Sequence, residues 1–198
     1  SEIEIYARQF RAAGHQLVSR PEEADLAVVN TCAVTAAASA DSRKKIRSIA
    51  RDSQAKIAVT GCWSTLQAEK AEKLPSVESV ISNLDKDLLV TNILGQSQES
   101  FDLEPVVREP IPGARLKTRA FIKVQDGCDN RCTFCITTVA RGPARSRSVG
   151  EVLEDIHAAV EGGSKEVVLT GVHLGSWGQD FHRPAHLSEL VELVLKDT

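Results

Sequence analysis

The sequence predicts an α/β protein in which the strands pair in parallel. Short apolar runs, each suited to a buried strand, alternate with segments of helical periodicity in both halves of the chain. Such alternation favours parallel strands joined by right-handed crossovers. The chain has 198 residues, of which 42% are hydrophobic and 26% charged, so we expect a globular protein with one large or two small domains.

The first half of the chain contains signals for three strands and four helices. We expect helices over residues 2–13, 41–51, 65–74 and 84–94, and strands over residues 26–29, 56–60 and 77–81. Apolar residues at helical spacing, among them Ile46 and Ile49, mark the second helix. Gly14, Pro75 and Gly95 are placed to end three of the helices.

The composition changes between the two halves. Gln, Ser, Glu and Pro dominate residues 96–113 and no periodicity persists there, so we expect a linker. The expected domains are then residues 1–95 and 114–198. The chain starts at Ser1 and contains no Met, which indicates a processed chain or a piece of a longer one.

The second half predicts two strand–helix units. Strands are expected over residues 120–124 and 166–170, and the helix between them opens with a capping box of Ser148 and Glu151. The apolar face of that helix carries Val149, Val152, Leu153, Ile156 and Val160, and that of the last helix carries Leu187, Leu190, Val191, Val194 and Leu195. Two such units leave strand edges open and cannot close a barrel, so we expect the natural protein to continue beyond Thr198.

The charge of the chain is unevenly distributed. A net charge of −3 does not suit a self-contained nucleic-acid binder. Residues 115–147, however, hold eight Lys or Arg and two Asp, a local charge of +6 around a cluster of cysteines. This local excess favours a phosphate-bearing partner such as RNA.

The sequence shows no membrane or secretion signal. No run of about 18 apolar residues occurs, and no charged start precedes an apolar stretch. We therefore expect a cytoplasmic protein with no membrane partner. Five cysteines are an odd number, which does not suit a disulfide framework, so metal ligation or catalysis is the better interpretation.

Three of the cysteines form a C-x3-C-x2-C pattern directly after the strand over residues 120–124. Thiolates are soft ligands that suit zinc or an iron–sulfur cluster. A structural zinc site takes four ligands, and the next His, His157, lies inside a predicted helix. A cubane cluster normally takes four thiolates, so three leave one iron open to another ligand. The pattern therefore favours an iron–sulfur site at Cys128, Cys132 and Cys135 over a zinc knuckle.

The other two cysteines, Cys32 and Cys62, each follow a predicted strand. The carboxyl ends of parallel strands lie at one edge of a sheet, where ligands bind in open α/β folds. Both cysteines are therefore candidate ligands. The alternative is that they are two small buried hydrophobic residues, and the residues alone leave both interpretations open.

Five stretches taken together resemble one family, the radical S-adenosylmethionine methylthiotransferases. They are residues 30–35 (NTCAVT), 60–62 (TGC), 121–135 (FIKVQDGCDNRCTFC), 141–147 (RGPARSR) and 169–176 (LTGVHLGS). The resemblance covers nearly the whole chain, in order, and includes the linker. It is thus far more specific than the cysteine triplet alone.

The resemblance implies an N-terminal α/β (methylthiotransferase N-terminal) domain and the first part of a radical SAM partial (β/α)6 barrel. It also implies two 4Fe-4S clusters: Cys128, Cys132 and Cys135 match the ligands of the radical SAM cluster. Cys32 and Cys62 match the second and third ligands of an auxiliary cluster, and we expect the first to precede residue 1. A small C-terminal β-barrel domain that grips RNA is also expected beyond this chain.

The same resemblance assigns three residues to S-adenosylmethionine binding. Phe134 is the aromatic residue before the last cysteine of the triplet, and Thr170 and Gly171 end the strand where the backbone meets the methionine amino group. A glycine permits that close approach. For Thr170 and Gly171 a plain strand-end turn remains the alternative.

The implied chemistry uses two molecules of S-adenosylmethionine. One methylates a sulfur at the auxiliary cluster, and the other is bound by the open iron and yields a 5′-deoxyadenosyl radical. The radical removes hydrogen from an unactivated C–H bond, where the methylthio group is inserted. An electron donor such as flavodoxin or ferredoxin is implied. This chemistry needs no general base, in agreement with a sequence that shows no Ser/His/Asp or paired-carboxylate pattern.

Three substrates occur within the family. The chain looks most like the enzymes that modify C2 of N6-threonylcarbamoyladenosine 37 (t6A37) in tRNA. The alternatives are N6-isopentenyladenosine 37 of tRNA and an aspartate of a ribosomal protein. From other classes, a non-catalytic iron–sulfur or zinc binding module would fill the fourth coordination site, and another radical enzyme, such as a carbon methyltransferase, would lack the auxiliary thiols.

Overall fold

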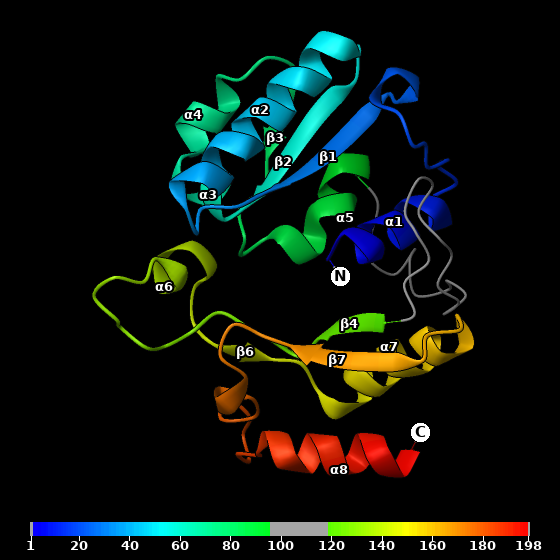
Figure 1. The fold of residues 1–198 in the computed structure, drawn as a ribbon, viewed down its shortest axis with the longest axis vertical. Helices are drawn as coiled ribbons and strands as arrows, with labels where there is room; N and C mark the ends of the chain where they lie inside the picture. The colour runs from blue at the N-terminus through cyan, green and yellow to red at the C-terminus, as the bar shows by residue number, and fades with distance from the viewer. Residues whose placement is uncertain (1, 96–118, 198) are drawn as a thin grey trace.

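The computed structural model describes residues 2–95 and 119–197, which form two α/β units, one above the other in Figure 1. The N-terminal unit is built on a parallel sheet with the order β1-β2-β3, and the C-terminal unit on a parallel pair, β4 and β7. The predicted α/β class with parallel strands is confirmed. The predicted linker over residues 96–113 lies outside the described residues, and the domain boundaries stay a prediction.

The N-terminal sheet consists of β1 (Leu26–Thr31), β2 (Lys56–Gly61) and β3 (Val77–Val80). Its helices are α1 (Glu2–Ala12), α2 (Ala36–Asp52), α3 (Cys62–Leu66), α4 (Ala68–Glu72) and α5 (Leu89–Leu94), with the short 3-10 helices η1 (Pro21–Glu23) and η2 (Lys86–Leu88). All three strands overlap the ranges that the sequence predicts.

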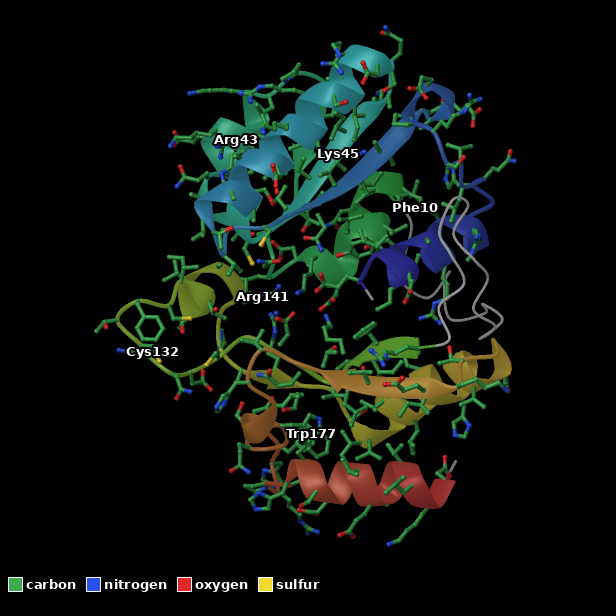
Figure 2. The ribbon with its side chains drawn as sticks, in the orientation of Figure 1. Phe10, Arg43, Lys45, Cys132, Arg141 and Trp177 are labelled. Atoms are coloured by element: carbon green, nitrogen blue, oxygen red, sulfur yellow. The ribbon has the colours of Figure 1, made fainter. Side chains whose placement is uncertain are left out.

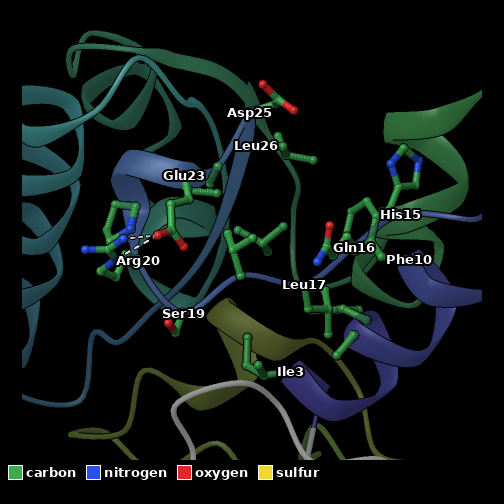
Figure 3. Close-up of a pocket in the computed structure, with 17 residues that line it drawn as sticks. Ile3, Phe10, His15, Gln16, Leu17, Ser19, Arg20, Glu23, Asp25 and Leu26 are labelled. Atoms are coloured by element: carbon green, nitrogen blue, oxygen red, sulfur yellow. Dashed lines mark hydrogen bonds and ion pairs between the residues drawn. The ribbon is translucent and has the colours of Figure 1, made fainter.

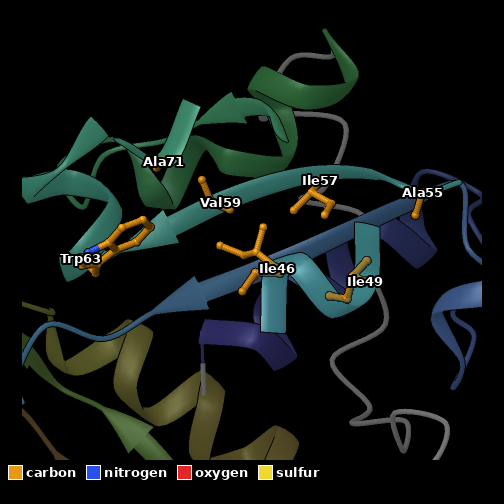
Figure 4. Close-up of a cluster of buried hydrophobic side chains, with 8 residues drawn as sticks. Ile46, Ile49, Ala55, Ile57, Val59, Trp63 and Ala71 are labelled. Atoms are coloured by element: carbon orange, nitrogen blue, oxygen red, sulfur yellow. The ribbon is translucent and has the colours of Figure 1, made fainter. Parts of the chain in front are cut away.

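Helices cover both faces of this sheet because its central strand is apolar on both. Ile57 and Val59 of β2 belong to one core, which Ile46 and Ile49 of α2 close (Figure 4). Ala58 points to the opposite face, where α1 and α5 form a second core. Successive side chains of a strand point to opposite faces, so one short apolar run supplies two cores.

Three helix predictions are wrong in detail. The helix expected over 84–94 begins with the 3-10 helix η2 and is α-helical only from Leu89. The helix expected over 65–74 is split into α3 and α4, because Gln67 between them leaves the helical backbone region (φ −135°, ψ 45°). The helix expected over 41–51 begins five residues earlier, at Ala36, where the Thr35 side chain accepts a hydrogen bond from the Ala38 N–H and caps it. A threonine followed by alanines is a good helix start.

The C-terminal unit consists of β4 (Arg119–Lys123), β5 (Gln125–Asp126), α6 (Thr137–Arg141), β6 (Arg145–Ser146), α7 (Val149–Glu161), β7 (Glu166–Thr170), the 3-10 helix η4 (Leu174–Ser176) and α8 (Leu187–Asp197). The capping box of Ser148 and Glu151 opens α7 as predicted. The antiparallel pair of β5 and β6 brackets the cysteine-rich segment, and the sequence did not predict it.

The apolar faces of α7 and α8 are narrower than the sequence pattern indicates. Val160 at the end of α7 is exposed, and so are Val191 and Leu195 of α8. In α8 the buried stripe is Leu190 with the partly buried Leu187 and Val194, which follow a spacing of three and four residues. A helix that contacts its unit along one stripe leaves its remaining apolar side chains in solvent. Across the described ranges, no helix has both the length and the apolar character needed to cross a lipid bilayer.

Candidate functional site

The two strand-end cysteines lie at the same edge of the N-terminal sheet. Thr31 and Gly61 are register partners at the carboxyl ends of β1 and β2. Cys32 and Cys62 are the next residue after each of them, so both lie just past the same edge of the sheet. The strand ends approach closely: a Cβ on Gly61, which has φ +99°, would lie 2.2 Å from the Thr31 carbonyl oxygen. Both thiols are free, with Cys62 buried and Cys32 half-buried. The predicted placement of both cysteines at one edge of the sheet is confirmed.

Cys62 has a hydrogen-bond donor at its sulfur. The Asn83 side-chain amide lies 3.4 Å from the Cys62 Sγ and also donates to the Ala140 carbonyl oxygen at 2.7 Å. Asn83 is only 2% exposed. The neighbouring Trp63 is buried in the core against β2, and the Arg43 guanidinium stacks on its ring at 5.6 Å. Trp63 therefore packs as a core residue.

The cysteine loop (residues 127–136, between β5 and α6) is held by hydrogen bonds at its base and is exposed to solvent at its tip. The Cys128 N–H donates to the Gly142 carbonyl at 3.1 Å, and the Thr138 hydroxyl donates to the Cys128 carbonyl at 3.0 Å. Cys132 lies at the outer end of the loop, away from both sheets (Figure 2). Cys132, Cys135 and Phe134 are exposed, Phe134 at 93%. The loop therefore presents its thiols and its aromatic ring to the outside.

The donor chemistry of the loop suits a thiophilic metal centre. Its three thiols are free, and hydrogen bonds from the Thr137 side chain and backbone lower the pKa of Cys135, which favours the thiolate that ligation requires. Within residues 2–95 and 119–197, no three His, Cys, Asp or Glu side chains are gathered around one point in a geometry that could hold a metal ion. The ligand sets therefore stay predictions.

The carboxyl ends of β4 and β7 bring the second predicted segment to the base of the loop. Lys123 and Thr170 are register partners, and the Val124 N–H donates to the Thr170 carbonyl at 2.8 Å. A Cβ on Gly171 would lie 3.0 Å from the Cβ of Gln125. Thr170 and Gly171 thus end the strand beside the segment that leads into Cys128, which agrees with their predicted place. Their contact with a cofactor stays a prediction.

Gln125 ties these two segments together. Its side chain is buried, and its Nε2 donates to the carbonyls of Asp126 at 3.0 Å and Gly127 at 2.8 Å. Its Oε1 accepts the backbone N–H of His173 at 2.9 Å. The side chain of His173 has no part in this contact. A buried amide that satisfies three backbone groups fixes the start of the cysteine loop against the turn after β7.

Asp126 is the centre of a buried ion-pair network. Its carboxylate accepts hydrogen bonds from the Lys86 ammonium and, at 2.8 Å, from the Arg141 guanidinium. Lys86 also pairs with Glu2 at 2.6 Å. Burial by itself would raise the pKa of Asp126, but the hydrogen bonds and charges of Lys86 and Arg141 outweigh it and hold that pKa well below its usual value. Asp126 is therefore ionised at neutral pH.

Two family models match the chain. The model described as "Uncharacterized protein family UPF0004" matches residues 1–82, and the model of the "Radical SAM superfamily" matches residues 122–194. Two proteins named threonylcarbamoyladenosine tRNA methylthiotransferase MtaB, from Bacillus subtilis and Thermotoga maritima, are 35% and 37% identical over 90% and 98% of the chain. The chain belongs to the radical S-adenosylmethionine methylthiotransferase family.

Relatives within the methylthiotransferase family carry different names. The ribosomal protein uS12 methylthiotransferase RimO of Carboxydothermus hydrogenoformans is 32% identical over 98% of the chain. The chain spans 42% and 46% of the two MtaB proteins and 46% of that RimO, about half of each. Membership of the radical SAM superfamily implies S-adenosylmethionine and an iron–sulfur cluster as cofactors.

Arg141 and Arg147 of the RGPARSR stretch make hydrogen bonds and ion pairs within this methylthiotransferase chain. Arg141 pairs with Asp126, and Figure 2 shows it at the inner end of α6, toward the two sheets. Arg147 donates to Asp155 at 2.7 Å and to the Lys123 carbonyl at 3.0 Å. Asp155 also accepts from Arg8 of the N-terminal unit at 3.4 Å. These two arginines therefore hold the protein together at the base of the site.

A pocket of about 450 Å³ lies at the opposite end of β1 from the cysteines (Figure 3). It is lined by α1, the segment over residues 15–20 and the start of β1, with an ion pair between Arg20 and Glu23 at its rim. None of the five cysteines lines it. The pocket is therefore separate from the candidate site of the methylthiotransferase family.

Sequence reasoning missed the buried polar residues that position the site, namely Asn83, Lys86 and Gln125. Each is almost completely buried. The only sequence signal was position: Gln125 follows a predicted strand and precedes the cysteine motif, Asn83 follows the third strand, and Lys86 falls within the helix expected over residues 84–94. Polar residues at such places read as ordinary turn or surface residues until their partners are known.

Gly127 is required at the entrance of the cysteine loop, and Gly127→Ala is expected to disrupt it. Gly127 has φ +71°, and a Cβ there would lie 1.8 Å from the Pro143 carbonyl oxygen. The strain and the clash with backbone should destabilise the protein by about 2–4 kcal/mol, measured by urea unfolding. Gly150→Ala in α7 is the matched control, because nothing lies within 4 Å of its added methyl, and it should be neutral or slightly stabilising. Equal effects of the two substitutions would contradict this prediction.

Proposed function

We propose that the full-length protein is a tRNA methylthiotransferase, which adds a methylthio group to C2 of N6-threonylcarbamoyladenosine 37 (t6A37) by radical SAM chemistry. The observation that carries the proposal is the contact that joins one set of free thiols to the segment that follows the other, across the interface of the two units. Cys62 of the N-terminal unit is connected through Asn83 to α6, the helix that follows the cysteine loop. A transfer that combines a radical with a sulfur source needs two such sites near one substrate.

Two 4Fe-4S clusters are proposed as cofactors. Cys128, Cys132 and Cys135 would hold the radical SAM cluster, and Cys32 and Cys62 would hold the auxiliary cluster together with a ligand that precedes residue 1. When bound, the radical cluster and S-adenosylmethionine supply a carbon radical that can remove hydrogen from an unactivated C–H bond. Phe134, Thr170 and Gly171 would line the place of S-adenosylmethionine. The reductant is proposed to be a flavodoxin or a ferredoxin.

The residues of this chain supply binding and orientation. The buried side chains of Gln125 and Asp126 fix the entrance of the cysteine loop, while the thiols at its tip are exposed to incoming groups. The +6 charge of residues 115–147 would favour the phosphates of tRNA around the same loop. The names of the MtaB relatives support t6A37 as the target, and the names of the RimO relatives make ribosomal protein uS12 the alternative.

The test uses the full-length protein, reconstituted anaerobically with iron and sulfide. It is assayed with three substrates: tRNA that carries t6A37, tRNA that carries N6-isopentenyladenosine 37, and ribosomal protein uS12. Methylthiolation of the first alone, with formation of 5′-deoxyadenosine, is the expected result. Product only on uS12 or on the isopentenyl tRNA would move the assignment to that substrate. No 5′-deoxyadenosine with any substrate would indicate a non-catalytic metal-binding module.

A further inference from the structure

One loop of the N-terminal unit contacts both ends of the cysteine loop of the C-terminal unit. This bridging loop (residues 82–88) follows β3 and includes η2. One of its residues reaches the exit of the cysteine loop and another reaches the entrance. Both are at most 2% exposed, although one is an amide and the other an ammonium. Burial of such polar groups is costly unless they are hydrogen-bonded, so these contacts are built into the fold.

Asn83 makes the contact at the exit. Its amide group donates to the Ala140 carbonyl of α6 at 2.7 Å and lies 3.4 Å from the Cys62 sulfur. Its backbone N–H donates to the Thr65 hydroxyl at 2.9 Å, and that hydroxyl donates to the Gly61 carbonyl at 2.8 Å. Asn83 is thus anchored in the N-terminal unit and connects the sulfur of Cys62 to the helix that follows Cys135.

Lys86 makes the contact at the entrance. Its ammonium pairs with Asp126, two residues before Cys128, and with Glu2 of α1 at 2.6 Å. Asp126 in turn accepts the Gly127 N–H at 2.9 Å and the Arg141 guanidinium at 2.8 Å. The entrance of the cysteine loop is therefore held to the N-terminal unit through one buried charge. Two contacts at opposite ends of a loop prevent it from pivoting about either one.

We propose that Asn83 and Lys86 are positioning residues that set the separation between the cysteine loop and Cys62. This role of Asn83 and Lys86 rests on the proposed function: a radical formed at the cysteine loop and a sulfur held at Cys32 and Cys62 must reach the same substrate carbon. Misplacement of reacting groups by about 1 Å costs as much as 100-fold in rate. A shift of the loop would therefore separate radical formation from transfer, while each site by itself stays intact.

The first test does not depend on any cofactor or activity. Hydrogen–deuterium exchange is measured on the full-length protein without clusters, as the wild type, Asn83→Ala and the control Asn92→Ala, which alters an exposed asparagine on α5. Asn83→Ala is expected to speed exchange in residues 137–142 about 5–10-fold, because α6 loses its link to the N-terminal unit. Exchange there that equals that of Asn92→Ala would overturn the proposal.

The second test measures coupling in the reconstituted full-length enzyme. The ratio of methylthiolated tRNA to 5′-deoxyadenosine is expected to fall about 10–100-fold in Asn83→Ala and Lys86→Met, with 5′-deoxyadenosine formation nearly kept. The control is Lys56→Met, which removes an exposed pair with Glu78 within the N-terminal unit. An unchanged ratio, or an equal loss of both products, would overturn the positioning role. If Lys86→Met does not fold, by circular dichroism, Asn83→Ala decides alone.

The two tests separate this proposal from the proposed function. If the wild-type enzyme methylthiolates none of the tRNA or protein substrates, the proposed function fails. The exchange experiment still decides whether Asn83 and Lys86 hold the cysteine loop.

Discussion

Cys132→Ala in the full-length protein is expected to abolish 5′-deoxyadenosine formation and to lower the bound iron by about four atoms per chain. Cys132 lies at the exposed tip of the cysteine loop, so its removal leaves the buried network at the base of the loop untouched. With one of three thiolates missing, the proposed radical cluster lacks one of its protein ligands. Iron analysis and product chromatography after anaerobic reconstitution measure both effects.

The matched control for this experiment is the double variant Cys32→Ala/Cys62→Ala. It should also lose about four iron atoms, because the proposed auxiliary cluster is removed, yet it should still form 5′-deoxyadenosine. It should form no methylthiolated tRNA. If Cys132→Ala still cleaves S-adenosylmethionine, the cysteine loop is not the radical site. If the double variant retains full iron, Cys32 and Cys62 are not ligands.

Lys86→Met is expected to have the largest effect on stability, a loss of about 3–5 kcal/mol in the free energy of unfolding near neutral pH. The Lys86 side chain is 1% exposed and pairs with Asp126 and Glu2, so its replacement leaves the buried carboxylate of Asp126 and the partly buried one of Glu2 without their main partner. Urea unfolding of the full-length protein without clusters measures the loss. Lys56→Met, which removes an exposed ion pair with Glu78, should cost at most about 1 kcal/mol.

The effect of Lys86→Met should depend on pH in a defined direction. The pKa values of Asp126 and Glu2 are lowered in the folded protein from 3.8 and 4.5, because Lys86 outweighs the opposing effect of burial. A carboxyl with a lowered pKa stabilises the fold above its unfolded pKa and loses that contribution as pH falls through the folded pKa. The difference between wild type and Lys86→Met should therefore be full near pH 7 and shrink below about pH 4. A difference that stays constant over this range would falsify the network's electrostatic origin.

The strands of the two parallel sheets and most of the longer helices could be predicted because their signals are local. The run over residues 56–60 reads as a buried strand, and β2 occupies Lys56–Gly61. The placement of Cys32 and Cys62 followed from the same reasoning, since parallel pairing brings strand ends to one edge. The split of the expected helix at Gln67 and the early start of α2 at Ala36 were missed, because helix ends depend on single capping and backbone preferences.

The positioning of the site could not be predicted in the same way. The sequence places Asn83 in a turn and Lys86 in the helix expected over residues 84–94, and each lies forty or more residues from its partner, Ala140 or Asp126. Nothing in the local pattern distinguishes a buried lysine from an exposed one. The same holds for Arg141 and Arg147, because no local pattern indicates that they pair with Asp126 and Asp155.

The sequence by itself determined the α/β class, the order of the parallel strands and the longer helices, and the three-cysteine motif, because these depend on local periodicity and on the chemistry of adjacent residues. Only the tertiary structure decided how the two units meet: one loop after β3 holds both ends of the cysteine loop through an amide and a buried ammonium. The physical reason is that a hydrogen bond or ion pair between distant segments depends on the packing of both units. That packing brings the partners together and removes the water that would otherwise compete for them.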